Sequence, residues 1–100
     1  MKLWEIILPR ESNTGESYQH AHSEICVMLL EAFGGYTSVS ACGGWLDGSI
    51  VYEEDVTCYR ILSETRPALD WAFDLFPDQL AICINEIGSG EIVRRAAGEP

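Results

Sequence analysis

The stretch FGGYTSVSACGGWLDGS, Phe33–Ser49, decides the fold of this chain. Asp47-Gly48 lies between apolar residues and is typical of a tight hairpin turn, because such a turn needs positive φ angles. Gly34-Gly35 follows a helical pattern and is typical of a helix end. The stretch therefore predicts a helix end, a strand over 36–45, a turn, and a further strand over 50–62.

The glycines of this stretch raise the alternative of a phosphate-binding loop. Such a loop needs backbone N–H groups that converge at the start of a helix, usually with a lysine. Gly34-Gly35 instead follows a helix, Gly43-Gly44 falls inside the predicted hairpin, and no lysine is near. We therefore interpret Gly43-Gly44 as space for the rings of Trp45 and Tyr52 beside the backbone.

The other elements follow from the spacing of apolar residues. A strand over 2–8 ends at Pro9, and a helix over 18–33 has an apolar face with a period of about 3.6 residues. A second helix begins at Thr65-Arg66-Pro67, and a fourth strand covers 80–87. The expected apolar faces are Tyr18, Ala21, Ile25, Met28, Leu29 and Ala32 in the first helix, and Leu69, Ala72, Phe73 and Phe76 in the second.

The order of these elements is β-α-β-β-α-β. It predicts an α+β fold of the ferredoxin-like kind, in which two helices cover one face of a four-stranded antiparallel sheet and leave the other face open. We expect one domain over 1–100, with a short tail strand over 91–94 and fraying over 95–100.

A two-residue turn at Asp47-Gly48 would place Trp45 opposite Ile50 and Gly43 opposite Tyr52. We expect this side of the hairpin to face the core, and the other side, with Ser38, Ser40, Cys42 and Gly44, to face outward. Glu54 falls on the predicted core side, so we expect a β-bulge near 53–55 that turns it away. In this register Cys42 is not opposite Cys58, which argues against a disulfide between them.

The charge of the chain restricts its partners. Sixteen acidic residues against six basic ones give a net charge of −10, which repels nucleic acid and anionic membranes and attracts cationic protein surfaces. The cysteines lie singly in apolar surroundings, as in proteins of a reducing cytosol. Glu5 interrupts any signal-peptide core, and no apolar run reaches the roughly 20 residues of a membrane span. We expect a cytoplasmic protein.

Catalytic and metal motifs are weak. No Ser-His-Asp or Cys-His arrangement has supporting local context, so we expect a non-enzymatic protein without a cofactor. His22 and Cys26 are four residues apart on one helix face and are the weak candidates for metal ligands, but further ligands would have to come from another element. We expect His20 and His22 to lie at the surface near the start of the helix.

Acidic residues gather on the predicted hairpin. The simplest interpretation is a solvated acidic edge, and the functional one is a docking site for a basic protein. Aromatic side chains are frequent anchors in interfaces. The candidate partner-binding residues are Asp47, Glu53, Glu54, Asp55, Tyr36 and Tyr59.

The chain resembles a loose group of small, uncharacterised ferredoxin-like proteins of bacterial and phage genomes. The resemblance covers residues 3–62 and is carried by Phe33-Gly34-Gly35-Tyr36-Thr37, Gly43-Gly44-Trp45 and Val51-Tyr52-Glu53-Glu54. These motifs are structural, so the resemblance implies the fold and no catalytic residue.

Size, charge and the lack of catalytic motifs favour a small acidic binding protein of the phage type. It would occupy a basic surface of a host defence protein, as an anti-CRISPR does, in the host cytoplasm, and form a homodimer through the open sheet face. One alternative is a dimer that sequesters a nucleotide-like signal, which would need several arginines to converge. Another is a small ferredoxin-like enzyme that uses His20, His22 or Tyr36.

Overall fold

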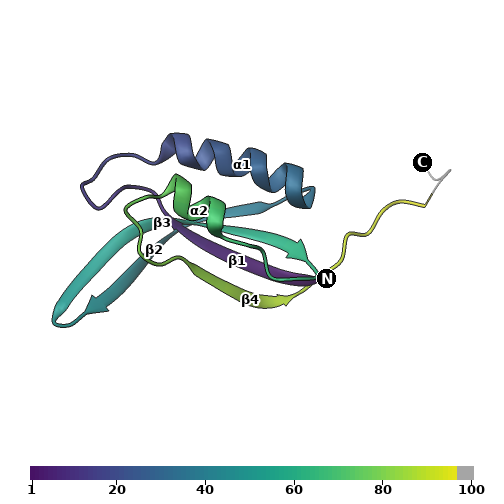
Figure 1. The fold of residues 1–100 in the computed structure, drawn as a ribbon. Helices are drawn as coiled ribbons and strands as arrows, with labels where there is room; N and C mark the ends of the chain where they lie inside the picture. The colour runs from purple at the N-terminus through teal and green to yellow at the C-terminus, as the bar shows by residue number, and fades with distance from the viewer. Residues whose placement is uncertain (97–100) are drawn as a thin grey trace.

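Four antiparallel strands form one sheet in the order β2-β3-β1-β4, and both helices lie on the same face of it (Figure 1). The computed structural model describes residues 1–96. The elements are β1 (Lys2–Pro9), α1 (Gln19–Phe33), β2 (Thr37–Asp47), β3 (Ile50–Ser63), α2 (Asp70–Leu75) and β4 (Cys83–Ser89). The predicted α+β class and the order of elements along the chain are confirmed.

The core lies between the sheet and the helices. Alternate residues of β1 face the helices because side chains alternate along a strand, and Ile6 and Trp4 lie opposite Tyr59 and Ile61 of β3. The helices contribute residues at helical spacing. The core cluster is Trp4, Ile6, Leu8, Ala21, Ile25, Leu29, Tyr59, Ile61, Leu69, Ala72 and Phe76.

The predicted end of α1 is confirmed, whereas the predicted start of α2 is not. As predicted, α1 ends at Gly34, which has a φ of +79° and donates its backbone N–H to the carbonyl of Leu30 at 2.9 Å. By contrast, α2 begins at Asp70 and not at Thr65-Arg66-Pro67, so it is shorter than predicted. Pro67 and Leu69 precede the helix and are buried. Phe73 was expected in the core, but it lies on the outer side of α2 and is 38% exposed.

The tail forms no strand within residues 90–96, contrary to the strand expected over 91–94. β4 runs beside β1 up to the first residues of the chain, where Gly90 donates its N–H to the carbonyl of Met1. β1 begins at Lys2, so the tail from Glu91 onwards runs past the end of its neighbouring strand. The part of the predicted frayed segment at 97–100 lies outside the described residues.

The register of the β2–β3 hairpin differs from the prediction, and so does the side of the hairpin that faces the helices. Gly48 and Ser49 form the turn, Gly48 has a φ of +63°, and Trp45 lies opposite Tyr52 instead of Ile50. The pairing of β2 with β3 runs without a bulge. Because Tyr59 faces the helices, strand alternation places Tyr52 and Trp45 on the open face. Cys42 lies opposite Asp55, not Cys58, as expected.

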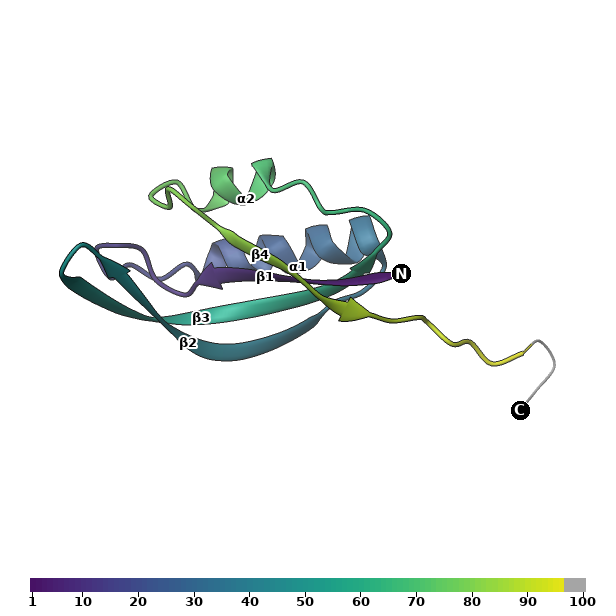
Figure 2. The same cartoon turned by 90° about the horizontal axis from the view of Figure 1, so that it is seen from below.

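The hairpin extends beyond the rest of the sheet (Figure 2). Of the residues of β3, β1 pairs with 56–63, and residues 50–54 pair with β2 alone. The carbonyl of Asp55 accepts a hydrogen bond from the N–H of Arg10, just after β1, at 3.0 Å. This projecting end carries the candidate site. Within residues 1–96, no helix is both long and apolar enough to cross a membrane.

Candidate functional site

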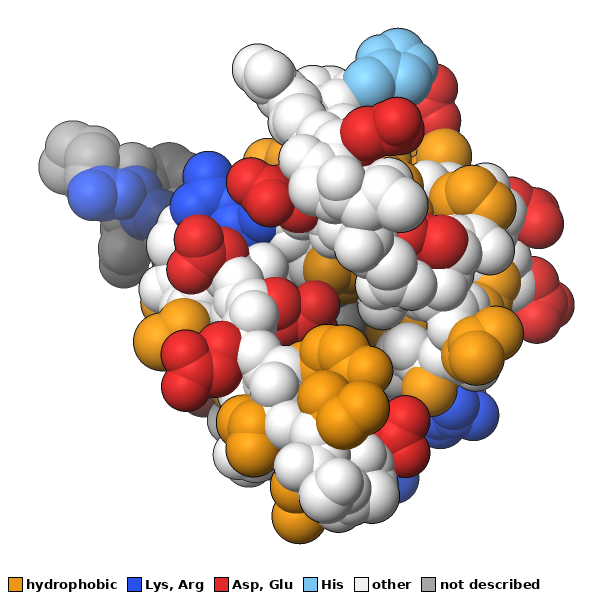
Figure 3. Space-filling view, turned by 90° about the vertical axis from the view of Figure 1, so that its left-hand side faces the viewer, with side chains coloured by type: hydrophobic (Ala, Val, Ile, Leu, Met, Phe, Trp, Pro, Cys, Tyr) orange, Lys and Arg blue, Asp and Glu red, His pale blue; other side chains and the backbone are white. Residues whose placement is uncertain are grey.

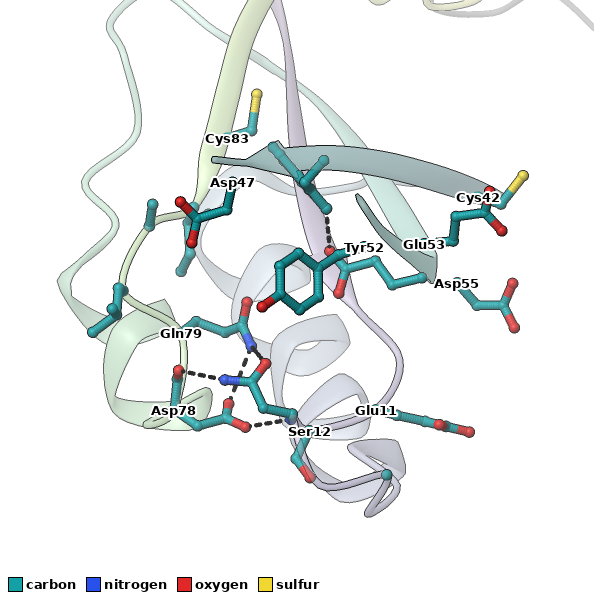
Figure 4. Close-up of a pocket in the computed structure, with 17 residues that line it drawn as sticks. Glu11, Ser12, Cys42, Asp47, Tyr52, Glu53, Asp55, Asp78, Gln79 and Cys83 are labelled. Atoms are coloured by element: carbon teal, nitrogen blue, oxygen red, sulfur yellow. Dashed lines mark hydrogen bonds between the residues drawn. The ribbon is translucent and has the colours of Figure 1, made fainter. Parts of the chain in front are cut away.

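A groove of about 1110 Å³ lies between the hairpin, the loop after β1 and the loop before β4 (Figure 4). We call it the acidic groove, because no Lys or Arg of the described chain lines it. Figure 3 shows acidic side chains around hydrophobic ones at this end of the molecule. The carboxylates that line the groove are Glu11, Asp47, Glu53, Glu54, Asp55 and Asp78.

An aromatic pair lies among these carboxylates. Trp45 and Tyr52 are opposite each other on the open face and are 48% and 50% exposed. The indole N–H of Trp45 donates to Oε1 of Glu54 at 2.7 Å, a contact between diagonal neighbours on one face of the hairpin. Exposed aromatic faces beside a carboxylate suit a lysine or arginine side chain, which gains both cation–π and ionic contacts.

Asp78 holds the two loops of the groove together. Its carboxylate accepts hydrogen bonds from the hydroxyl of Tyr18 and, at 2.6 Å, from the backbone N–H of Asn13. The side chain of Asn13 donates to the carbonyl of Asp78 at 3.1 Å, and Gln79 donates to Oδ1 of Asn13 at 3.3 Å. We call these four residues the loop clamp. Figure 4 shows Asp78 and Gln79 facing the loop after β1.

The loop clamp also changes the acidity of its members. The hydrogen bond from Tyr18, followed by that from Asn13, lowers the pKa of the Asp78 carboxyl below 3.8. Burial, together with the neighbouring Asp78, raises the pKa of the Tyr18 hydroxyl to about 12. Asp78 is therefore ionised and Tyr18 protonated at neutral pH.

Asp78→Ala should lower the free energy of unfolding by about 1–3 kcal/mol, because the charge-assisted hydrogen bonds of Asn13 and Tyr18 are lost. Urea denaturation at neutral pH measures this. Asp74→Ala on α2, an exposed acid, is the control and should change stability little. Since the carboxyl has a lowered pKa in the folded state, its stabilisation should be lost as the pH falls below 3.8. Equal stability of the two variants at neutral pH would contradict the clamp.

The structure brings the four predicted acids to the acidic groove, but on both faces of the hairpin. Asp47 and Glu54 share the open face with Trp45, whereas Glu53 and Asp55 lie opposite Gly44 and Cys42 on the other face. In Figure 4 Glu53 and Asp55 point away from Tyr52. The acids therefore surround the hairpin end and do not line one wall.

The two predicted tyrosines lie elsewhere. Tyr59 is 2% exposed within the core, and the ring of Tyr36 packs edge-on against it at 5.8 Å between centroids. Burial, followed by the nearby Cys26, raises the pKa of the Tyr59 hydroxyl well above its usual range. Neither tyrosine lines the acidic groove.

His22 is partly buried, and both of its ring nitrogens contact protein atoms, whereas we expected it at the surface. Its Nε2 lies 2.8 Å from the carbonyl of Pro9, and its Nδ1 lies 2.6 Å from the hydroxyl of Tyr59. The carbonyl can only accept, so Nε2 carries the proton and Nδ1 accepts from Tyr59. Both ring nitrogens are engaged and neither has a free lone pair for a metal. Within residues 1–96, no group of three His, Cys, Asp or Glu is arranged to hold a metal.

Sequence reasoning missed Glu11 and Asp78 as groove residues. Glu11 lies in the loop after β1, and Asp78 lies in the loop before β4, 67 residues further along the chain. A signal was present in the predicted topology, because β4 runs antiparallel to β1 and its start must lie beside the end of β1. The clamp contacts themselves depend on side-chain geometry that no spacing indicates.

A scan against protein-family models, a search of curated proteins and a search of solved structures each gave no match to this chain.

Proposed function

We propose that this chain is a non-enzymatic, ferredoxin-like binding protein whose acidic groove occupies a basic surface of a partner protein. The supporting observation is the groove itself, where six carboxylates and an exposed Trp45–Tyr52 pair meet without a lysine or arginine from residues 1–96. A surface of one charge sign that contains exposed aromatic anchors is typical of a protein interface.

The contact would combine long-range and short-range attraction. A net charge of −10 steers a cationic surface towards the molecule and raises the rate of association. Arginine or lysine side chains would then lie over Trp45 and Tyr52 and form ion pairs with Asp47 and Glu54. Binding should therefore weaken as the salt concentration rises.

The partner would be a protein whose basic surface normally holds nucleic acid. By covering that surface, the chain would act as a phage-type inhibitor of a host defence protein, such as an anti-CRISPR. The support for this version is the same acidic groove, because a protein that replaces the phosphate backbone needs closely spaced negative charges.

The groove gives less support to the alternatives. A nucleotide-like signal is anionic, and Arg60, a possible phosphate ligand, is already paired with Glu5 at 3.0 Å. For an enzyme, His22 is the central candidate, but both of its ring nitrogens bind protein atoms. We therefore propose the protein-binding function alone.

Reversing the charge of Glu53, Glu54 and Asp55 to lysine should weaken partner binding by about 100-fold or more. Removing one partner of a hydrogen-bonded charge pair that is buried in an interface costs about 2–5 kcal/mol, and about 1.4 kcal/mol is tenfold in affinity. The tagged wild type and this variant are used to capture proteins from a bacterial lysate, read by mass spectrometry. Each captured partner is then titrated with the purified chain, with and without a competing DNA or RNA duplex.

The matched control reverses three exposed acids outside the groove, Glu31, Asp74 and Glu91, and gives the same net charge. The proposal expects partners that the control retains, that the groove variant loses, and that nucleic acid displaces. Partners that both variants bind equally would show that only net charge matters and would overturn the proposal.

A further inference from the structure

The outer edge of β2 lacks the usual protection of an edge strand. β2 is one of the two edges of the sheet and has 11 residues, without proline and without a bulge in its pairing to β3. In a chain of net charge −10, its only charged residue is Asp47 at the end. Proteins usually protect such edges with charges, prolines or bulges, because free N–H and C=O groups pair with any available strand.

The other edge is protected. The pairing of β4 to β1 has a register shift between Leu3 and Trp4, and β4 carries Glu86, which pairs with Lys2 at 3.4 Å. A charged and irregular edge resists the addition of another strand. The contrast indicates that β2, and not β4, is the edge built to receive a strand.

We propose that a second copy of this chain pairs with β2 in antiparallel orientation, about a two-fold axis at Cys42. A second copy brings the same strand, which has no charged residue before Asp47, so the strand contact itself places no like charges opposite each other. Cys42 is the midpoint of Thr37–Asp47, and pairing about it uses the full length of both strands. The product is one continuous eight-stranded antiparallel sheet.

This register also matches the side chains. Val39, 38% exposed, lies opposite Trp45 of the second copy, which is 48% exposed, so the two large apolar side chains on the open face of β2 become cross-strand neighbours. Ala41 lies opposite Gly43 of the second copy. A shift of the register by two residues separates Val39 from Trp45 and shortens the pairing. The acids of β3 lie one strand spacing, about 4.8 Å, behind the contact.

Cys42 provides the first test, since it is exposed and would lie directly opposite its own copy. Directly opposite Cα atoms in an antiparallel pair are about 4.5–5.5 Å apart, within the range of a disulfide. Mild oxidation of the purified full chain should give a cross-linked dimer on non-reducing gels. Cys42→Ser should abolish the cross-link completely, and Cys83→Ser should leave it unchanged.

A second cysteine pair tests the register. With all four native cysteines replaced by serine, Ser40→Cys and Gly44→Cys are made as separate proteins, because residue 40 would face residue 44 of the other copy. A Cβ at Gly44 meets only the carbonyl oxygen of Tyr52, at 3.9 Å, so the fold accepts this change. The mixture should cross-link, and each protein alone should not. Equal cross-linking of the mixture and the single proteins would overturn the register.

The oligomeric state tests the interface without a chemical cross-link. The wild type and Cys42→Ser should sediment at twice the chain mass of 11.1 kDa. Cys42→Lys should sediment as a monomer, because two lysines would face each other on the axis, while within one chain the lysine lies beside Asp55 and favours the fold. A wild type that stays monomeric at its highest concentration overturns the proposal. So does a dimer that Cys42→Lys leaves intact, which would place the second copy on another surface, such as the open sheet face.

Discussion

Replacing Phe76 by alanine should lower the free energy of unfolding by about 3–5 kcal/mol, the largest stability loss we expect from one substitution in this chain. Phe76 follows the short helix α2 and is completely buried. The rings of Tyr18 and His22 pack edge-on against it, with centroids 4.6 and 5.4 Å away. A cavity here would remove the packing of Phe76 against Tyr18 and His22 and would open the core that α2 shares with the sheet and α1.

Urea denaturation followed by near-ultraviolet circular dichroism measures the loss from Phe76→Ala. The control is Phe73→Ala in the same helix, where the side chain is 38% exposed and we expect a change below about 1.5 kcal/mol. If both variants lost the same stability, α2 would not be anchored to the core through Phe76. Total stabilities of about 5–15 kcal/mol are usual for small domains, so Phe76→Ala is also expected to populate unfolded chain on heating.

Replacing His22 by phenylalanine should lower the free energy of unfolding by about 2–4 kcal/mol at neutral pH. The change removes two hydrogen bonds and leaves the carbonyl of Pro9 and the hydroxyl of Tyr59 without a partner, at about 1–3 kcal/mol for each buried group. The ring keeps most of the packing volume, so the loss reports the polar contacts. His20→Ala, an exposed position of the same helix, is the control and should cost much less.

His22 should also make stability depend on pH. Burial, aided by the charge of Arg10, lowers the pKa of the His22 ring below 6.5, although the hydrogen bond to Pro9 acts in the opposite direction. The unfolded chain therefore binds the proton more tightly than the folded chain does. The stabilisation is fully present above pH 6.5 and is lost as the pH falls from 6.5 through the folded-state pKa.

Urea unfolding at one pH unit above and one below 6.5 tests this dependence. The wild type should be less stable at the lower pH, and His22→Phe should lose most of the difference. This window is separate from that of Asp78, whose contribution is lost only below 3.8. A difference that persists in His22→Phe would assign the pH dependence to other groups.

Much of the fold could be predicted because local patterns and core packing agree. The alternation of Trp4, Ile6 and Leu8 and the helical spacing of Ala21, Ile25 and Leu29 each place one apolar side on the same core. Gly34 ends α1 for a local reason, its left-handed backbone conformation. The four candidate partner-binding acids could be located at one end of the molecule because they lie on a single hairpin.

The prediction was wrong where a local rule had two solutions. A turn at Asp47-Gly48 and one at Gly48-Ser49 both place a glycine at positive φ, and they differ in every pair of the hairpin. Both registers also put Trp45, Tyr52 and Glu54 on one side, so the sequence pattern could not show which side faces the helices. The long-range pairing of Ile6 with Tyr59 decides this, and it turns Trp45 to the open face.

The sequence by itself determined the class of fold, the order of its elements and the acidic end of the hairpin, because these depend on spacing and charge along short segments. Only the tertiary structure decided that Glu11 and Asp78 join the hairpin acids in one groove and that His22 is hydrogen-bonded at both ring nitrogens. It also decided that β2 is an edge strand without a bulge in its pairing. The physical reason is that each of these depends on contacts between segments far apart in the chain, and antiparallel pairing sets those contacts only when the whole sheet has formed.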